Sequence, residues 1–281
     1  MAGVSGCSFT KPLPATIRAA FRIAGTHRGR SRRVDAQKTD ALIIRLADFS
    51  NTSRVVTFFT RDFGKVSAIA KGGKRLKGPF ESSLDLLAEV GIVFLRKSSG
   101  ALDILTEARL TRRFRPNPAS MESFYAGCYI AELLAGLTED YDPHPELFDA
   151  ARWALAEFST EGDYRLPLLR FELTLLRENG QLPAFDECVH CGESISVGGR
   201  YSFWVSQGGL LCPSCQKQEY ATHQVQAGTV AILRRLAEAS DSAASRMTAS
   251  PQQLKELRHT LTAAISGILG RRPKSLSYLK F

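Results

Sequence analysis

Four of the six cysteines stand in two closely spaced pairs, a pattern that suits metal binding. Two residues separate Cys188 from Cys191 and Cys212 from Cys215, and twenty residues separate the two pairs. A two-residue gap lets both thiolates bind one ion from a tight turn, each about 2.3 Å from a zinc ion. A spacer of roughly 15 to 20 residues is long enough to form a hairpin that brings the second cysteine pair to the same ion. The quartet therefore predicts one structural zinc ion (Zn2+) per chain, held in a closed shell without catalytic water.

The residues between the cysteine pairs are typical of a zinc ribbon. The spacer contains YSFWVSQGGLLC, which predicts a strand, a turn at Gly208 and Gly209, and a second strand. Disulfide bonds are the alternative, and they are disfavoured because no export signal is recognisable. A redox-active cysteine pair would normally occur singly. His190 and His223 lie near enough in sequence to replace a cysteine ligand, although neither is needed.

A run of basic residues forms a second group with defined chemistry. Residues 65–77 contain five cations and no acid, and two glycines in the run let the backbone approach a ligand closely. This pattern favours sequence-independent contact with a phosphate backbone, and a solvated loop is the alternative. The run is not a nucleotide-binding P-loop, because Ala68 replaces its first glycine and Arg75 replaces the Ser or Thr that would hold magnesium. The cations of the run are Lys65, Lys71, Lys74, Arg75 and Lys77.

Short apolar runs on both sides of these cations predict a compact β domain over residues 38–111. The expected strands are residues 41–46, 54–60, 65–70, 84–95 and 102–110. Five strands in about 70 residues fit a closed barrel better than an open sheet, because closure removes exposed edges. We therefore predict a five-stranded OB-fold barrel.

The hydrophobic period becomes helical beyond the barrel and predicts an α-helical domain over residues 112–281. The ribbon is expected as an insertion at about 186–220. Gly180 is placed to end one helix, and Ser250 with Gln253 forms a capping-box pattern at the start of another. The expected helices are residues 119–137, 146–158, 164–179 and 250–270. The predicted fold class is thus multidomain α+β, with a barrel followed by helices that carry a four-cysteine ribbon.

The net charge of +9 is concentrated in the first part of the chain. Residues 1–37 hold seven cations and one anion, residues 38–110 carry a net charge of +4, and residues 111–281 carry −1. The first 37 residues lack apolar periodicity and predict a disordered basic extension. Neither a signal-peptide core nor a run of about 18 apolar residues occurs, so we expect a cytoplasmic protein without a membrane partner. An organelle transit peptide in residues 1–37 is the alternative.

Three longer stretches carry a more specific pattern. They are TDALIIRLADFSNTSRVVTFFTRDFGKVSAIAKGGKR at residues 39–75, FYAGCYIAELLAGLTED at 124–140, and LPLLRFELTLLRENGQLPAFDECVHCG at 166–192. In this order, with a basic barrel, a helical domain and an inserted ribbon, they resemble the family of the bacterial DNA repair protein RecO. The resemblance covers about residues 38–270 and leaves the first 37 without a counterpart. Zinc occurs in only some members of that family, and here all four positions are cysteine.

The resemblance implies a recombination mediator rather than an enzyme. Members of the family bind single- and double-stranded DNA, anneal complementary strands and are associated with the nucleoid. With RecR they help to load RecA, an indirect partner, onto strands covered by single-strand-binding protein (SSB). Lys71, Lys74 and Arg75 fall on the family's DNA-binding loop. Lys77, Lys65 and Arg54 are further candidate contacts.

The resemblance also implies a contact with the C-terminal tail of SSB. Arg170 matches an arginine on a helix that receives this acidic and apolar tail. The neighbouring Leu166, Leu169 and Leu173 would supply apolar contacts beside the cation.

Two other functions were weighed against the mediator. A hydrolase of nucleic acids would need clustered acids to hold metal ions, whereas the barrel segment offers only scattered ones such as Asp48, Asp62 and Asp85. A zinc-ribbon factor that binds RNA or acts in transcription is the main alternative to the mediator.

Overall fold

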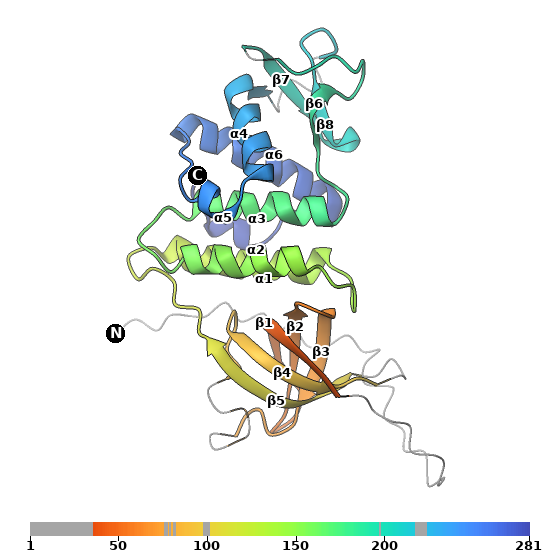
Figure 1. The fold of residues 1–281 in the computed structure, drawn as a ribbon, viewed down its shortest axis with the longest axis vertical. Coiled ribbons are helices and arrows are strands. Elements are labelled where there is room, and N and C mark those ends of the chain that lie inside the picture. Colours follow the sequence, from red (N-terminus) through yellow and green to blue (C-terminus); the bar gives the residue numbers. More distant parts are fainter. Residues whose placement is uncertain are drawn as a thin grey trace.

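The protein is elongated and stacks a barrel, a set of helices and a ribbon from one end to the other (Figure 1). The computed structural model describes residues 36–75, 78, 80, 83–97, 102–196, 198–216 and 224–281. The predicted basic extension therefore lies outside the described residues up to position 35, and so does Lys77. Ala36 and Gln37, which we expected in the extension, already belong to the first strand.

Five strands close into a barrel, as predicted for the N-terminal part of the chain. They are β1 (Ala36–Asp48), β2 (Arg54–Thr60), β3 (Gly64–Ala70), β4 (Glu89–Leu95) and β5 (Asp103–Arg112). Neighbouring strands are antiparallel except β3 and β5, and β4 returns to pair with β1. Alternate residues of β3 and β4 are buried, which is the period-2 pattern expected of strands that wrap a core. The barrel therefore has an apolar interior of its own.

Strand β1 is buried on both faces near its middle. Ala41 and Ile43 belong to the barrel core, whereas Leu42 and Ile44 belong to the core formed with the helices. This double burial explains why the sequence shows a continuous apolar run there instead of an alternating one.

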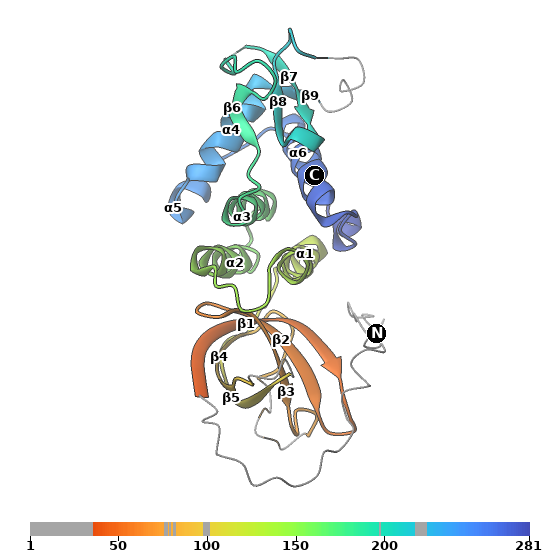
Figure 2. The same ribbon diagram turned by 90° about the vertical axis from the view of Figure 1, so that its right-hand side faces the viewer.

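Two helices cover the barrel, and the other helices lie beyond them (Figure 2). The first two are α1 (Met121–Leu137), which packs on β1, and α2 (Pro145–Glu157), which packs on β2. The remaining helices are α3 (Arg165–Glu178), α4 (Ala227–Glu238), the short α5 (Asp241–Ala244) and α6 (Pro251–Leu269). The predicted capping box is present at Ser250 and Gln253, and Gly180 has the expected left-handed backbone. In the described part of the chain, every helix is too short or too polar to span a membrane.

The ribbon is a small sheet packed on the helices. Its strands are β6 (Ala184–Cys188), β7 (Arg200–Trp204), β8 (Gly209–Leu211) and β9 (Gln224–Gln226), in the order β6-β8-β7-β9. The predicted β7–β8 hairpin is confirmed, with a short 3-10 turn followed by Gly208 in the left-handed region. Tyr201, Phe203 and Leu210 belong to the same core as the helices. The ribbon is therefore an extension of the helical core rather than a separate unit.

The loop after α1 fastens the helices to the barrel. The Tyr141 N–H donates to the carbonyl of Lys65 at 3.0 Å. Gly64, with φ of 63°, lies so close to the backbone of Asp142 that any Cβ would collide with it. A residue other than glycine would therefore force the loop away from the barrel.

Candidate metal centre and nucleic-acid interface

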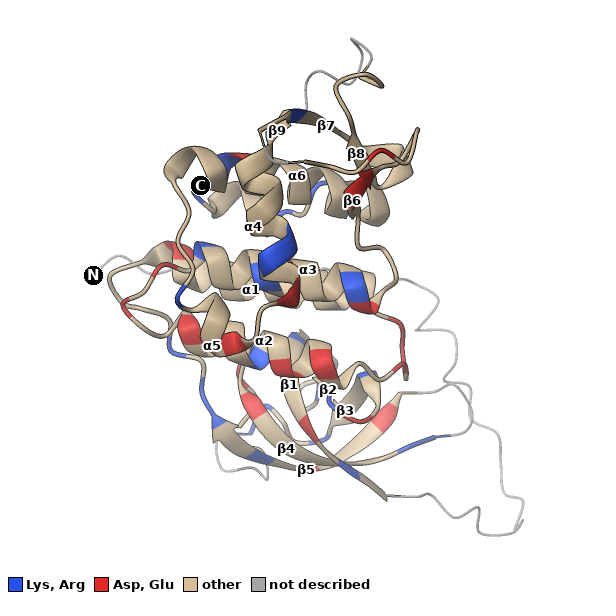
Figure 3. Cartoon of the chain, turned by 45° about the horizontal axis from the view of Figure 1, so that its top comes forward, with Lys and Arg blue, Asp and Glu red and all other residues tan. Residues whose placement is uncertain are grey.

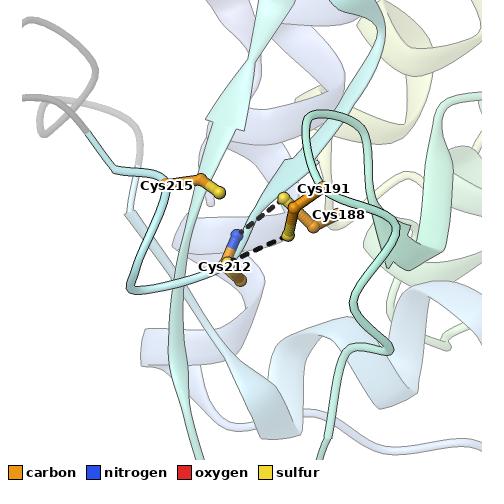
Figure 4. A group of neighbouring side chains, drawn as sticks. All are labelled: Cys188, Cys191, Cys212 and Cys215. Carbon is orange, nitrogen blue, oxygen red and sulfur yellow. Dashed lines mark hydrogen bonds between the residues drawn. The ribbon is translucent and has the colours of Figure 1, made fainter.

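The four cysteines of the quartet converge at one point of the ribbon (Figure 4). All four Sγ atoms lie within 4.8 Å of one another, and Cys191 Sγ is 3.7 Å from Cys212 Sγ. Sulfur atoms about 2.3 Å from a tetrahedral zinc ion would be roughly 3.8 Å apart, so the observed spacing fits such an ion. Cys188 ends β6 and Cys212 directly follows β8, which places each pair at the end of a ribbon strand. The quartet can therefore hold a metal ion.

Backbone donors favour the charged form of one thiol. Burial opposes ionisation of Cys188, but the N–H groups of Cys212, Cys191 and His190 lower its pKa to about 6. The Cys212 N–H lies 3.3 Å from the Cys188 sulfur. In contrast, the nearby thiols of Cys191 and Cys212 raise the pKa of Cys215 to about 12. Crowded thiols ionise together only when a cation lies between them, which is the role of a bound metal ion.

The metal-binding group contains no histidine among the described residues. His190 is exposed in the turn between Cys188 and Cys191 but is not part of the group. His223 lies outside the described residues.

The loop after β3 presents two cations to solvent. Lys71 and Arg75 are exposed, and neither forms a salt bridge in the described part of the chain. Gly72 has a φ of 78°, and the Lys74 N–H donates to the carbonyl of Thr52 at 3.1 Å. This hydrogen bond holds the loop against the turn between β1 and β2. Both signs of charge occur on the barrel and on the helices, so position rather than total charge distinguishes these two cations (Figure 3).

Two other predicted contacts share one acid at the edge of this loop. Lys74 Nζ is 3.0 Å from Asp48, and Arg54 Nε is 3.4 Å from the same carboxylate. The ammonium of Lys74 is the main cause of the lowered pKa of Asp48. Asp48 and Arg54 are opposite each other in the β1–β2 register, so recognition of the hairpin would have revealed this pair. Lys74 of the loop and Arg54 of β2 are therefore already paired with Asp48.

Lys65 lies at the other end of β3, away from the loop. Its Nζ donates to the carbonyls of Thr138 at 2.5 Å and Ala135 at 3.2 Å, and it lies 3.6 Å from Asp140. Lys65 therefore caps the C-terminal carbonyls of α1, where a cation is favoured by the helix dipole. This placement argues against Lys65 as a DNA contact. The sequence missed it because its partners lie about 70 residues further along the chain.

Arg170 lies on α3 and is engaged within the helical domain. Its Nε and Nη2 donate to the Ala239 carbonyl at 3.1 and 3.0 Å, and Nη2 is 2.8 Å from Asp241. The guanidinium carbon lies 4.8 Å from the centre of the Trp153 ring. Its Nη1 is buried without a hydrogen-bond partner among the described residues. One donor of the group is thus left over.

The apolar neighbours that we predicted for Arg170 are not available to a partner. Leu169 and Leu173 are 0% and 1% exposed, and Leu166 is 9% exposed. Their side chains fill the helical core instead of facing solvent. The half-buried Trp153 is the apolar surface that accompanies this cation.

Comparison with known proteins covers both halves of the chain. A family model described as Recombination protein O N terminal matches residues 35–114, and one described as Recombination protein O C terminal matches residues 118–277. The chain belongs to the RecO family. The resemblance noted in the sequence is therefore confirmed, and so is the predicted order of a sheet-rich N-terminal part and a helical part with a cysteine cluster.

Curated members of the RecO family resemble the chain over most of its length. The DNA repair protein RecO of Rhodopirellula baltica is 36% identical over 85% of this chain and 97% of its own length. Those of Syntrophus aciditrophicus and Anaeromyxobacter dehalogenans strain 2CP-1 are 31% and 30% identical, over 86% and 88% of this chain. The relatives' own lengths are covered to 94% and 96%. Membership of the RecO family supports a role in DNA repair and recombination.

Proposed function

We propose that this RecO-family protein is a recombination mediator without bond-making catalysis. It binds single- and double-stranded DNA, anneals complementary strands and, with RecR, helps to load RecA onto SSB-coated single-stranded DNA. The observation that carries the proposal is the exposed pair Lys71 and Arg75, which no acid of the described residues neutralises, on a loop of a closed five-stranded barrel. Barrels of this type commonly bind single strands along a basic surface.

Acids of the described barrel are occupied in ways that do not suit a metal-dependent nuclease. Asp48 is shared by Lys74 and Arg54. Glu89 pairs with Arg112 on the neighbouring strand β5 and with Arg152 of α2 across the barrel–helix junction. Asp103 is 1% exposed and accepts hydrogen bonds from the Lys97 N–H and the Tyr141 hydroxyl. A two-metal reaction would need several of these carboxylates free and close together, so the mediator is the better proposal.

The DNA contact would centre on the exposed pair and extend to its paired neighbours. Lys71 and Arg75 can bind phosphates directly, whereas Lys74 and Arg54 must first exchange Asp48 for a phosphate. A phosphate can make that exchange because exposed ion pairs contribute only about 0–1 kcal/mol. Lys77, outside the described residues, is a further proposed contact.

The contact is tested with the double variant Lys71→Ala/Arg75→Ala. A matched control, Arg235→Ala/Arg246→Ala, removes two exposed cations from the helical part of the chain. Fluorescence anisotropy with a labelled single strand, repeated at several salt concentrations, gives the affinity and its salt slope. We expect the loop variant to bind more weakly and its slope to fall by about 1.4, since each phosphate on a single strand contributes about 0.7. An unchanged affinity and slope, or an equal loss in the control, would refute the loop assignment.

The metal of the cysteine quartet is proposed to be zinc. Four thiolates at tetrahedral spacing form a closed set that suits a structural zinc ion and leaves no open coordination position. Such an ion would hold the ribbon in place against α4 and α6. Elemental analysis is expected to give one zinc per chain, and another metal at this stoichiometry would contradict the assignment.

Arg170 is retained as the proposed contact for the SSB tail, with a different apolar neighbour. The Nη2 of Arg170, which lies 2.8 Å from the exposed Asp241, would donate to a carboxylate of the tail, and Trp153 would supply the apolar contact. Asp241 competes for the same guanidinium. We therefore expect Asp241→Ala to tighten binding of a tail peptide several-fold and Arg170→Ala to weaken it. If neither substitution changes the affinity, the tail binds elsewhere.

A further inference from the structure

The junction between the ribbon and α6 contains a surface hollow with a volume of about 350 Å³. Strands β7 and β9 lie beside the start of α6 there, on the far side of the helices from the barrel (Figure 2). Three exposed basic side chains line the hollow: Arg200 from β7, and Lys255 and His259 from α6. The lining is entirely polar, which distinguishes this hollow from an unfilled part of the core.

The geometry of the two elements brings these side chains together. Arg200 is paired with Gln226 in the β7–β9 register, and its Nη1 donates to the side chain of Gln224 at 3.2 Å. Lys255 and His259 are four residues apart on α6 and therefore lie on one face of the helix. The cations thus come from two elements that are fixed relative to each other.

Glu256, the one acid among the described residues that line the hollow, joins the ribbon to the helix. The carboxylate of Glu256 accepts hydrogen bonds from the Gln226 N–H at 3.1 Å, the Thr229 hydroxyl at 2.6 Å and the Gln252 amide at 2.9 Å. Burial opposes its ionisation, yet the bonds from Thr229, Gln252 and Gln226 hold the pKa of Glu256 below its ordinary value. Glu256 is therefore a structural carboxylate.

Two basic groups of the hollow, Arg200 and Lys255, remain accessible to an anion. Within the described residues, neither Arg200 nor Lys255 forms a salt bridge. The Arg200 guanidinium donates only to a neutral amide, and Lys255 extends from an exposed position. The hollow therefore combines exposed cations with glutamine amides, while its acid is held by hydrogen bonds.

We propose that this hollow is a second nucleic-acid-binding site, distinct from the barrel loop, which takes one or a few nucleotides of a single strand. Arg200, Lys255 and His259 would contact the sugar-phosphate backbone, and the side chains of Gln224, Gln226 and Gln252 would hydrogen-bond base edges. A volume near the lower end of the range for small-ligand pockets suits an unstacked nucleotide better than a duplex.

The composition of the lining favours nucleic acid over a peptide. The centres of protein interfaces are enriched in aromatic and apolar side chains, and none of the described residues that line this hollow is of either kind. Glutamine amides both donate and accept hydrogen bonds, as the edges of bases require. Because the barrel loop lies at the other end of the molecule, one protein chain would then hold two strands at once (Figure 1).

The test uses Arg200→Ala/Lys255→Ala, introduced into the full-length protein and into the loop variant Lys71→Ala/Arg75→Ala. The probe is fluorescein-labelled dT8, titrated at low salt. We expect the loop variant to keep residual binding, and the added hollow substitutions to weaken that binding about tenfold and lower its salt slope by about 1.4. The charge-matched control is Arg235→Ala/Arg246→Ala in the same background, with no such loss expected. Residual binding that is unchanged by the hollow substitutions overturns the proposal.

The same set of proteins separates failure of the two proposed surfaces. Full binding by the loop variant alone, together with loss in the hollow variant, would refute the barrel contact and support the hollow. The charge-conserving variant Arg200→Lys/Lys255→Arg is expected to recover at least half of the affinity that Arg200→Ala/Lys255→Ala loses. Its zinc content and circular dichroism verify that it is folded. If it binds no better than the alanine variant while folded, the hollow does not act through its cations.

The nature of the ligand is tested by competition. An eight-residue glutamate peptide is added to the complex of the loop variant with labelled dT8. We expect it to displace the strand less effectively than unlabelled dT8 does at equal concentration. More effective displacement by the peptide would overturn the assignment to nucleic acid and indicate an acidic protein segment.

Discussion

The barrel and the ribbon are both small β units, but different interactions hold them together. The barrel is closed, so its strands have no free edges, and its core contains large apolar residues such as Phe58, Ile92 and Phe94. The ribbon has strands of only three to five residues, and its apolar residues merge with the helical core. Four cysteine side chains occupy the place where the ribbon would otherwise need a core of its own.

The difference suggests how each unit serves the molecule. A closed barrel is stable without help from its loops, so the loop with Lys71 and Arg75 can carry cations that no acid in the described part of the chain neutralises. The ribbon is too small to be stable alone, and its cysteines are used for its own structure. The barrel can therefore act through its surface, whereas a metal ion bound by the four cysteines would maintain the structure of the ribbon.

Loss of the metal should have the largest effect on stability, and this effect should be confined to the ribbon and the helices next to it. Cys212→Ser, or treatment with a chelator, is expected to destabilise the ribbon and the adjacent helices by on the order of 5 kcal/mol or more, because binding energy is folding energy at such sites. Hydrogen exchange should show faster exchange in β6–β9, α4 and α6, while β1–β5 stay protected.

The control for metal loss is Cys128→Ser, since this buried cysteine of α1 is outside the quartet. It is expected to keep a full equivalent of metal. Equal loss of protection in the barrel and the ribbon would remove the contrast between the two units.

A buried ion pair gives the second largest effect. Arg258 Nη2 lies 2.7 Å from Glu172, which is 0% exposed and also accepts a hydrogen bond from Tyr129 at 2.5 Å. Arg258→Met should lower the free energy of unfolding by about 3–5 kcal/mol, because the carboxylate is left buried without its cation. Glu172→Leu/Arg258→Met should be less destabilised than the single variant in urea unfolding. A double variant that is no more stable than Arg258→Met would show that the pair contributes through shape instead of charge.

The junction between barrel and helices gives a smaller effect. Gly64→Ala is expected to cost more than about 1 kcal/mol, since a left-handed backbone and a collision with Asp142 act together. Gly180→Ala is the matched control, because Gly180 has nearly the same φ of 65° but nothing within 4 Å of an added Cβ. The difference between the two variants in thermal unfolding isolates the contact between the loop and the barrel. Equal costs would mean that the loop does not hold the barrel in place.

The smallest expected effect concerns Asp48, the acid that pairs with Lys74 in the loop after β3. Asp48→Asn should change stability by less than about 1 kcal/mol, because its pairs with Lys74 and Arg54 are largely exposed. It should raise the affinity for a single strand a few-fold by releasing both cations. Weaker DNA binding in this variant would contradict the proposal that Lys74 and Arg54 exchange Asp48 for a phosphate.

Local patterns predicted the parts of the fold that depend on neighbouring residues. The cysteine spacing predicted the metal cluster, and Ser250 with Gln253 predicted the start of α6, because each pattern acts within a few residues of chain. The barrel was predicted from five short apolar runs separated by turn residues, although β1 is longer than expected and residues 84–88 precede β4 instead of belonging to it. Leu87 in that segment has a φ of 64°, a backbone conformation that the apolar pattern does not reveal.

The roles of individual charges were predicted less well, because they depend on partners distant in sequence. Lys65 belongs to the basic run but binds the end of α1. Arg170 was expected to face a partner, yet Ala239 and Asp241, about 70 residues away, occupy most of its donors. The basic hollow combines Arg200 with residues of α6 more than 50 positions later. A charge pattern shows that cations are present, and only the fold shows which of them lack an internal partner.

The central claim is that the protein brings DNA strands together without cutting them. The most direct measurement mixes two complementary strands, labelled with a donor and an acceptor fluorophore, with the protein and magnesium, and follows energy transfer and strand length together. The account predicts faster duplex formation with the wild-type protein than with Lys71→Ala/Arg75→Ala, and strands that keep their full length. Shortened strands, or duplex formation no faster than without protein, would contradict it.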